Sequence, residues 1–519
     1  METSRRKFIQ ITGLSSLGLR LLPHFQSFSQ MSQSLIRKTP ESQGVDSAGI
    51  RAFLKAAKDS GLEWHSFMLL RHGNVVAEGW WKPFQAEYKH TLYSLSKSFT
   101  SSAIGFLVSE GKISVEDSVM KFFPKEVPQN PSENFKSMKI KHLLTMNTGH
   151  HTDSMPDLRD NSTQSWVKSF LAKPVEHEPS TFFMYNTGAT YMLGAIVHKV
   201  TGQLLEDYLK PRLFEPLGIT GYDWEKSPQG LNTAGYGLRV STEDIAKFGQ
   251  FYLQKGKWNG KQLLPMSWVA EATKKQTTSQ SGDNDWSQGY GYQFWRCKPG
   301  FYRGDGAFGQ FCMIMPEQDA VLVMTCESFD LQKTMNVAYE TILPVLKNSA
   351  LPENPTDLNA LRNEIAALNL SVPKSSISSK LSSKYSDKVF QVEKNGYGIT
   401  KIGFGLFADA GVLRIWNEKE SGFKKIGFGW ENWKVNKDKV AYEFNVAGRT
   451  PVPSKIAATG TWLNDNTLQI NFKFVDAIHG DKLTFVFEDN KVILSLLNSV
   501  AENSKGTVDK REKLMGIIA

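Results

Sequence analysis

Ser94 and Lys97 stand three residues apart in an S-x-x-K pattern, and helix-spaced apolar residues follow them. If a helix begins here, residues i and i+3 share one face, so the Lys97 amine can reach the Ser94 hydroxyl. A serine hydroxyl is a weak nucleophile until a neighbouring base takes its proton. Burial lowers the pKa of a lysine toward neutrality, and a neutral lysine can be that base. The pattern alone is a weak signal, because a solvated helix end would look the same.

The segments around this pair carry more information than the pair itself. Residues 92–111 read L-Y-S-L-S-K-S-F-T-S-S-A-I-G-F-L-V-S-E-G, and further blocks follow at 142–149 (H-L-L-T-M-N-T-G), 237–246 (G-L-R-V-S-T-E-D-I-A) and 256–265 (G-K-W-N-G-K-Q-L-L-P). From about Lys38 to Leu346 the chain resembles the class C beta-lactamase-like and penicillin-binding-protein-like serine hydrolases. That family contains esterases, D-amino-acid peptidases, amide hydrolases and beta-lactamases. The resemblance implies an enzyme with Ser94 as nucleophile and Lys97 as its proton acceptor.

The second motif of this family is Y-x-N. Residues 183–188 read F-M-Y-N-T-G, so Tyr185 takes the tyrosine position. A tyrosine between Lys97 and the leaving group can relay the proton in acylation and deacylation. Thr187 stands where the family often has Asn, and we expect it to contact the substrate. A hydroxyl offers fewer hydrogen bonds than an amide, which weakens the case for beta-lactam recognition.

The third motif is K-T-G or H-x-G on a strand beside the serine. Residues 304–310 read G-D-G-A-F-G-Q, so Gly306 fits while Gly304 replaces the cationic residue. By resemblance, the backbone N–H groups of Ser94 and Ala307 would form the oxyanion hole. Arg303 lies next to Gly304. It either supplies the missing positive charge or is an ordinary surface arginine.

Apolar patterning divides the chain into two folded parts. Apolar runs flank turns at 71–74 and 316–319, which predicts a hairpin near each end of residues 31–350. With helical patterns between them, these hairpins predict an α/β (α+β) domain whose antiparallel sheet is flanked by helices and carries an inserted helical region. Residues 351–384 are predicted to be a linker with one short helix. Alternating apolar residues predict an all-β domain over 385–519, either a sandwich or a lipocalin-like barrel. Its aromatic strands either cap the Ser94 site or pack in its own core.

The net charge of +9 is spread along the chain without a clustered basic run, so we expect no nucleic-acid partner. The three cysteines do not form a disulfide framework, although one pair in an exported protein would have the chance to oxidise. His150, His151 and Asp153 are the tightest His/Asp group, and we interpret them as a polar loop rather than a metal site. We therefore expect no metal and no cofactor.

Residues 1–30 are predicted to be an export signal rather than part of the fold. Ser4–Ile9 resembles a twin-arginine signal, and a short apolar stretch follows from Ile11 to Leu22. This stretch suits a signal peptide, with a retained membrane anchor as the alternative. The expected location is periplasmic or otherwise exported, without a stable membrane anchor.

The residues together predict a serine hydrolase that cleaves an ester or amide of a small molecule or peptide. A carboxylesterase or amidase is the first expectation, because Gly304 offers no cation for a substrate carboxylate. A D-amino-acid or cell-wall peptidase is the second, and a weak beta-lactamase the third. A non-catalytic binding protein on the same scaffold is an alternative of another class.

Overall fold

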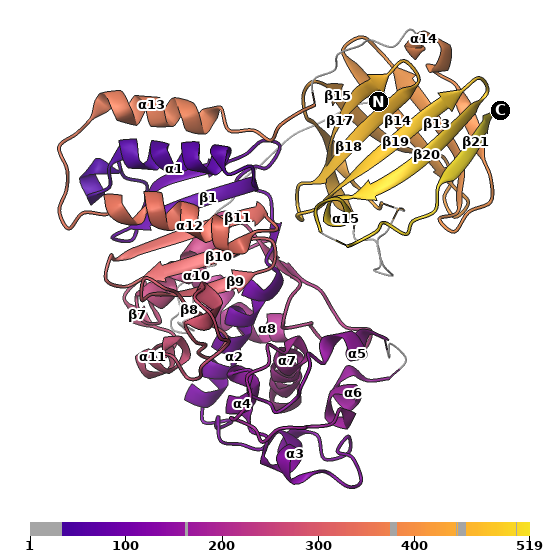
Figure 1. The fold of residues 1–519 in the computed structure, drawn as a ribbon. Coiled ribbons are helices and arrows are strands. Elements are labelled where there is room, and N and C mark those ends of the chain that lie inside the picture. Colours follow the sequence, from indigo (N-terminus) through magenta and orange to yellow (C-terminus); the bar gives the residue numbers. More distant parts are fainter. Residues whose placement is uncertain (1–33, 161–163, 374–380, 443, 445–452, 505) are drawn as a thin grey trace, which may run out of the picture.

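The computed structural model describes residues 34–519 except 161–163, 374–380, 443, 445–452 and 505. The predicted export signal lies outside the described residues, as does part of the predicted linker. The described chain forms an α/β domain with an antiparallel sheet, as the resemblance to the beta-lactamase-like hydrolases predicts, followed by a C-terminal β-barrel (Figure 1).

Six strands among the described residues form the sheet of the first domain, in the order β2-β1-β11-β10-β9-β8. Both predicted hairpins are confirmed, because β1 pairs with β2 and β10 pairs with β11. Strand β1 also pairs with β11, so strands from both ends of the domain lie side by side in the sheet. The bounds are Glu63–Arg71 (β1), Asn74–Trp80 (β2), Trp295–Arg296 (β8), Tyr302–Gly306 (β9), Gln310–Met315 (β10) and Ala320–Glu327 (β11).

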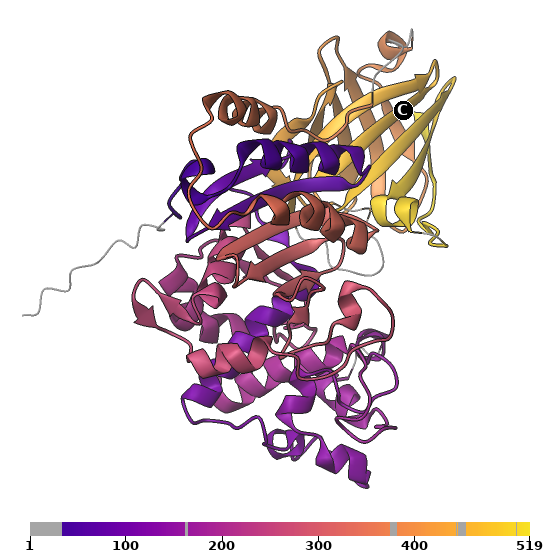
Figure 2. The same cartoon turned by 60° about the vertical axis from the view of Figure 1, so that its left-hand side comes forward.

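Helices cover both faces of this sheet. Neighbouring residues of a strand point to opposite sides, so a strand whose residues are all apolar needs a cover on each face. Phe67 and Leu69 of β1 pack in the cluster that includes residues of α1, α12 and α13. Met68 and Leu70 pack in the larger cluster that includes residues of α2, α7 and α10. Figures 1 and 2 show α1 and α13 on one side of the sheet and the inserted helical region on the other. The bounds are Ser47–Asp59 (α1), Ser96–Ser109 (α2), Thr187–Thr201 (α7), Thr242–Leu253 (α10), Leu331–Thr341 (α12) and Pro355–Ala366 (α13).

The helix predicted within the linker is α13, and it packs on the first domain. Arg51 of α1 makes ion pairs with Asp357 at 2.6 Å and Glu364 at 2.9 Å. Leu361 of α13 is buried in the cluster under α1. These contacts make α13 part of the cover of the sheet.

Shorter elements complete the first domain and the segment after it. They are η1 (Glu41–Gln43), β3 (His90–Thr91), η2 (Tyr93–Leu95), η3 (Val119–Phe122), α3 (Glu133–Ser137), α4 (Ile140–Leu144), α5 (Met155–Asp160), α6 (Trp166–Ala172), α8 (Leu205–Leu209), η4 (Lys210–Phe214), α9 (Glu215–Leu217), β4 (Asp223–Trp224), β5 (Leu238–Val240), β6 (Lys257–Trp258), β7 (Lys261–Gln262), α11 (Met266–Thr273), η5 (Asp285–Ser287), η6 (Leu343–Val345) and α14 (Ser382–Tyr385).

The C-terminal domain is a barrel rather than a sandwich. In the described residues nine strands form a closed ring, because β15 pairs with β17 at the point of closure, and β16 pairs with β17 outside the ring. Leu468, Ile470 and Phe472 of β18 all point into its core, as their alternation predicts. The bounds are Val389–Val392 (β12), Ile399–Leu406 (β13), Ala410–Asn417 (β14), Lys424–Trp430 (β15), Lys434–Val440 (β16), Ser454–Asn464 (β17), Thr467–Phe474 (β18), Gly480–Glu488 (β19), Lys491–Asn498 (β20), Ser499–Asn503 (α15) and Leu514–Ile518 (β21).

The barrel lies at the end of the sheet where β1 begins and β11 ends (Figure 2). Its Ala457 and Val475 are buried in the same cluster as residues of α1 and α12. The two domains therefore share hydrophobic packing. Within the described part of the chain, no helix combines the length and apolar character needed to cross a membrane.

Candidate active site

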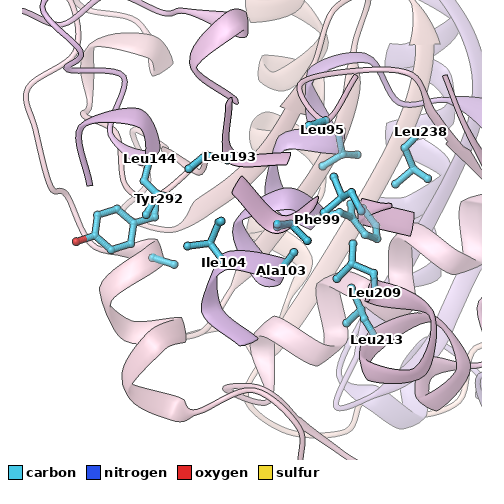
Figure 3. Close-up of a cluster of buried hydrophobic side chains, with 14 of the residues drawn as sticks. Leu95, Phe99, Ala103, Ile104, Leu144, Leu193, Leu209, Leu213, Leu238 and Tyr292 are labelled. Atoms are coloured by element: carbon cyan, nitrogen blue, oxygen red, sulfur yellow. The ribbon is translucent and has the colours of Figure 1, made fainter. Parts of the chain in front are cut away.

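Ser94 lies in the 3-10 turn η2, which leads directly into α2. Helix α2 is buried along most of its length, and Phe99 stacks on Phe248 with ring centroids 3.9 Å apart. Figure 3 shows Phe99 and Ile104 among apolar side chains from several other elements, including Leu193 and Leu209. Close packing on every side fixes α2 in the domain, and the position of Ser94 is fixed with it.

Lys97 reaches Ser94 as the i, i+3 spacing predicts. Its Nζ lies 3.0 Å from Ser94 Oγ, 2.7 Å from the Gly235 carbonyl oxygen and 3.5 Å from Thr187 Oγ1. A neutral amine has two N–H donors and one lone pair. With the two donors directed at Gly235 and Thr187, the lone pair faces the Ser94 hydroxyl.

The electrostatic surroundings of Lys97 favour the neutral amine. The side chain is almost fully buried, and this burial lowers its pKa to about 7. The carboxylates of Asp153 and Asp305 oppose the shift, since negative charge favours the ammonium form. The balance places the pKa of Lys97 close to neutral pH, where a general base is most effective.

Tyr185 lies beside this pair. Its ring stacks on Trp295 at 5.4 Å, and Lys97 Nζ lies 4.9 Å from the ring centroid. Burial raises the pKa of Tyr185 well above its usual value, while its interaction with Ser94 acts in the opposite direction. The phenol therefore keeps its proton near neutral pH, which suits a proton donor.

The segment that carries Tyr185 is held by hydrogen bonds on both sides. Asn186 caps α7 by accepting from the Ala189 N–H, and it also accepts from Ser154. The Thr187 N–H donates to Asp153 Oδ1 at 2.8 Å. Thr187 thus lies next to Lys97, and its contact with the substrate stays a prediction.

Strand β9 lies so close to residues 92–95 that a side chain at either of two glycines would force a neighbouring atom to shift. A Cβ on Gly304 would lie 2.2 Å from Leu95 Cδ1, and one on Gly306 would lie 2.1 Å from the Leu92 carbonyl oxygen. Gly304 therefore has two consequences for the site. It offers no cation to a substrate, and it allows the strand to pack against the start of α2.

The burial of Arg303 corrects one of the two interpretations made from the sequence. Arg303 is fully buried rather than exposed, so the surface-arginine interpretation is wrong. Its Nε donates to Asp305 at 2.9 Å and its Nη1 donates to the Arg296 carbonyl at 2.9 Å. It also lies over the ring of Trp286. These partners pair the charge of the guanidinium inside the protein. The pairing argues against its use as a free cation for the substrate.

Contacts on both sides place Ala307 near Ser94. Gly306 lies against the Leu92 carbonyl, and the ring of Phe308 packs edge-on against Tyr93 with centroids 5.2 Å apart. Both neighbours of Ala307 therefore contact the two residues that immediately precede Ser94. This arrangement is compatible with an oxyanion hole made by their two N–H groups.

The described residues contain two groups that bear on metal binding. His150 bonds with Thr148 and His151 with His177, so the polar loop directs its two histidines to different partners. Glu63, His65 and Glu327 lie close enough together to hold an ion. Lys473 Nζ from the barrel already lies between the two carboxylates, at 2.6 Å from Glu63 and 3.1 Å from Glu327. The positive charge at this group is supplied by a lysine. The three cysteines are free and buried.

The beta-lactamase family profile matches residues 50–347, which is more than half of the chain and includes Ser94, Lys97 and Tyr185. The chain belongs to the beta-lactamase family of serine hydrolases. Among the relatives of this family member, the 6-aminohexanoate-dimer hydrolase of Paenarthrobacter ureafaciens is 23% identical over 50% of this chain and 71% of its own length. The beta-lactamase of Escherichia coli K12 is 24% identical over 42% of this chain and 61% of its own length. A solved structure of a proposed 6-aminohexanoate-dimer hydrolase from Bacillus anthracis matches with a TM-score of 0.51 and 20% identity, covering 62% of this chain and 90% of its own.

Several residues of this family member's site gave no signal in the sequence. The Gly235 carbonyl is a backbone group, so its role depends on the loop path alone. Trp295 and Tyr290 surround Tyr185, and Asp305 lies on β9 two residues before Ala307. His479 of the barrel, which contacts Tyr93, was also missed. The aromatic strands of the barrel pack elsewhere: Phe428 is in the barrel core, and Trp433 donates to the Leu370 carbonyl.

Proposed function

We propose that this family member hydrolyses a carboxylic ester or amide through an acyl-enzyme on Ser94, as a carboxylesterase or amidase. The observation that carries the proposal is the contact between Ser94 Oγ and a buried Lys97 amine at 3.0 Å. A nucleophile and a base within hydrogen-bond reach, with the base oriented by a third group, form the arrangement that nucleophilic catalysis requires. The Gly235 carbonyl is the orienting group. This geometry also argues against a purely binding role.

In the proposed reaction, Ser94 Oγ attacks the carbonyl carbon while its proton passes to Lys97 Nζ. The tetrahedral oxyanion accepts hydrogen bonds from the N–H groups of Ser94 and Ala307. The bond to the leaving group then breaks, and the phenol of Tyr185 donates a proton to the departing oxygen or nitrogen. Lys97 returns a proton to Tyr185. A water molecule then attacks the acyl-enzyme and gives its proton to Lys97. The bond between Ser94 Oγ and the acyl carbon breaks, Lys97 passes that proton to Ser94 Oγ, and the acid product leaves.

The substrate we propose has no carboxylate that needs a cation from β9. Gly304 carries no side chain, and the charge of Arg303 is paired with Asp305. Penicillins and cephalosporins carry such a carboxylate, so this strand disfavours them. The likeness to the Paenarthrobacter 6-aminohexanoate-dimer hydrolase supports testing amides together with esters.

The proposal is tested by reaction with a fluorophosphonate probe and by a panel of short-chain esters, D-amino-acid amides and nitrocefin. Wild type is expected to react covalently with the probe and to turn over at least one ester or amide. Ser94→Ala is expected to lose both properties while its circular dichroism spectrum stays unchanged. Turnover by Ser94→Ala within tenfold of wild type would contradict the proposal, because loss of the nucleophile in such sites costs on the order of 10⁴–10⁶ in kcat.

A further inference from the structure

We infer that His479 of the C-terminal barrel is a positioning residue that holds the backbone on both sides of the oxyanion hole. The inference rests on the proposed function, and it gives the barrel a part in the chemistry although no barrel residue touches the reacting atoms in the proposed reaction.

His479 lies between the two segments that carry the oxyanion donors. Its Nε2 bonds with the Tyr93 hydroxyl at 2.5 Å, and Tyr93 immediately precedes Ser94. Its ring packs edge-on against Phe308 with centroids 4.8 Å apart, and Phe308 immediately follows Ala307. Tyr93 and Phe308 also contact each other. One imidazole therefore touches the neighbours of both donor residues.

Both of these neighbours have an uncommon backbone conformation. The φ angle is 47° at Tyr93 and 64° at Phe308, in the left-handed region that bulky residues avoid. Such conformations persist only where the surroundings hold them, and they concentrate at functional sites. The contacts of His479 fall on the side chains of these same two residues. Its hydrogen bond and ring contact therefore help to hold the conformations that direct the N–H groups.

His479 is itself fixed by the other domain. Its Nδ1 bonds with Glu327 Oε1 at 2.6 Å, at the end of β11. Glu327 is buried and also accepts hydrogen bonds from Lys473 and from the Ser499 hydroxyl, both of the barrel. Although burial would raise the pKa of Glu327, Lys473 and His479 keep it below its usual value, so the carboxylate stays charged. A charged acceptor makes these hydrogen bonds strong.

Backbone contacts keep the same barrel loop against the first domain. The Thr91 N–H donates to the Ala477 carbonyl at 3.3 Å, and Arg239 Nη1 donates to the Asp476 carbonyl at 3.4 Å. Thr91 lies three residues before Ser94. The loop between β18 and β19 thus lies against the chain segment that leads into the nucleophile.

The test uses the full-length chain and the hydrolysis of p-nitrophenyl acetate. His479→Ala and Tyr93→Phe are each expected to lower kcat about tenfold or more, with KM changed less than about threefold, because the oxyanion contact is made in the transition state. The double variant is expected to be no slower than the slower single variant, since both changes break one contact. His479→Gln keeps an amide that can bond with the Tyr93 hydroxyl and is expected to recover part of kcat. Lys482→Ala, which breaks an ion pair with Glu502 inside the barrel, is the matched control and is expected to keep wild-type kcat.

If His479 had only a structural role, its replacement would lower the melting temperature. It would not lower kcat with KM almost unchanged, and the double variant would be slower than either single variant. If His479→Ala does not fold, Tyr93→Phe and His479→Gln decide the question. The inference is overturned if kcat of these variants stays within twofold of wild type, or if the losses in the double variant multiply. Failure of wild type to react with the fluorophosphonate at Ser94 overturns the proposed function together with this inference. Reaction at Ser94 with unchanged kcat in the His479 variants overturns the inference alone.

Discussion

The Gly235 carbonyl oxygen accepts a hydrogen bond of 2.7 Å from Lys97 Nζ, and this contact determines which way the amine faces. In the neutral amine the second N–H is directed at Thr187, so the lone pair of Lys97 Nζ points to Ser94. A lysine that is almost fully buried, with one carbonyl and one hydroxyl as additional partners, is poorly solvated as an ammonium ion. Burial favours the neutral form of the base, while the contacts with Gly235 and Thr187 orient it.

The pH dependence of the reaction should report this lysine. Burial lowers the pKa of Lys97 to about 7, and only the neutral amine can accept the Ser94 proton. We expect kcat/KM for p-nitrophenyl acetate to fall as the pH drops through about 7 and to be steady just above it. A profile that is flat from pH 8 to pH 5 would contradict the role of Lys97 as base.

Asp153→Asn should move this profile in a defined direction. The Asp153 carboxylate raises the pKa of Lys97, so its neutralisation should lower that pKa and shift the acidic limb to lower pH. Asparagine keeps an oxygen for the Thr187 N–H, so the local hydrogen bond is preserved. The measurement is the midpoint of the kcat/KM profile. A shift to higher pH would show that the sign of the interaction is wrong.

Lys97→Met should abolish activity and raise stability at neutral pH. The pKa of Lys97 falls from 10.5 to about 7 on folding, so the unfolded chain binds more protons between these values and stability is lost as the pH drops toward 7. The shift corresponds to a penalty on the order of 4 kcal/mol at pH 7. The variant also loses the hydrogen bond to the Gly235 carbonyl, which offsets roughly 1–3 kcal/mol of the stabilisation. Thermal unfolding should show a higher midpoint than wild type at pH 7 and a smaller difference at pH 10. A lower midpoint at both pH values would contradict the expectation.

Beta-lactam turnover should be slow, and adding a lysine at position 304 should not create it. A Cβ there would lie 2.2 Å from Leu95 Cδ1 and 3.0 Å from Ser98 Oγ, so the substitution forces the buried Leu95 side chain to move. We expect Gly304→Lys and Gly304→Ala to lower the melting temperature and to hydrolyse nitrocefin no faster than wild type. Rapid nitrocefin hydrolysis by wild type would refute our account of substrate choice, as would a stable Gly304→Lys variant that gains this activity.

We also propose export through the twin-arginine signal of residues 1–30. Changing both Arg5 and Arg6 to Lys keeps the charge and should leave unprocessed protein in the cytoplasm of the expression host. Fractionation followed by immunoblotting measures this directly. Normal delivery of the double variant would indicate a different type of signal or an anchor.

The sequence was informative where local pattern determines structure. The apolar run at 67–70 and the alternation over 468–474 identified buried strands, and S-x-x-K spacing correctly brought Lys97 to Ser94. Patterning left open whether the C-terminal strands form a sandwich or a barrel, because closure depends on the pairing of β15 with β17, which no local periodicity encodes.

Contacts between distant segments were beyond the sequence. Arg303 is buried because its charge is paired with Asp305 on the same strand, and the adjacent sequence gave no sign of that burial. His479 lies 386 residues from Tyr93 in the chain, so its contact depends on how the two domains dock. Residues in such contacts have ordinary neighbours in the sequence, and only the tertiary structure shows their partners.

The central claim, an acyl-enzyme on Ser94, is tested most directly by trapping the intermediate. Wild type is mixed with excess p-nitrophenyl acetate, quenched in acid within the first turnovers, digested and analysed by peptide mass spectrometry. We predict an acetyl group on Ser94, absent from Ser94→Ala, in an amount that matches any initial burst of p-nitrophenol. Sustained turnover with Ser94 unmodified at every quench time, together with activity in Ser94→Ala, would contradict the account.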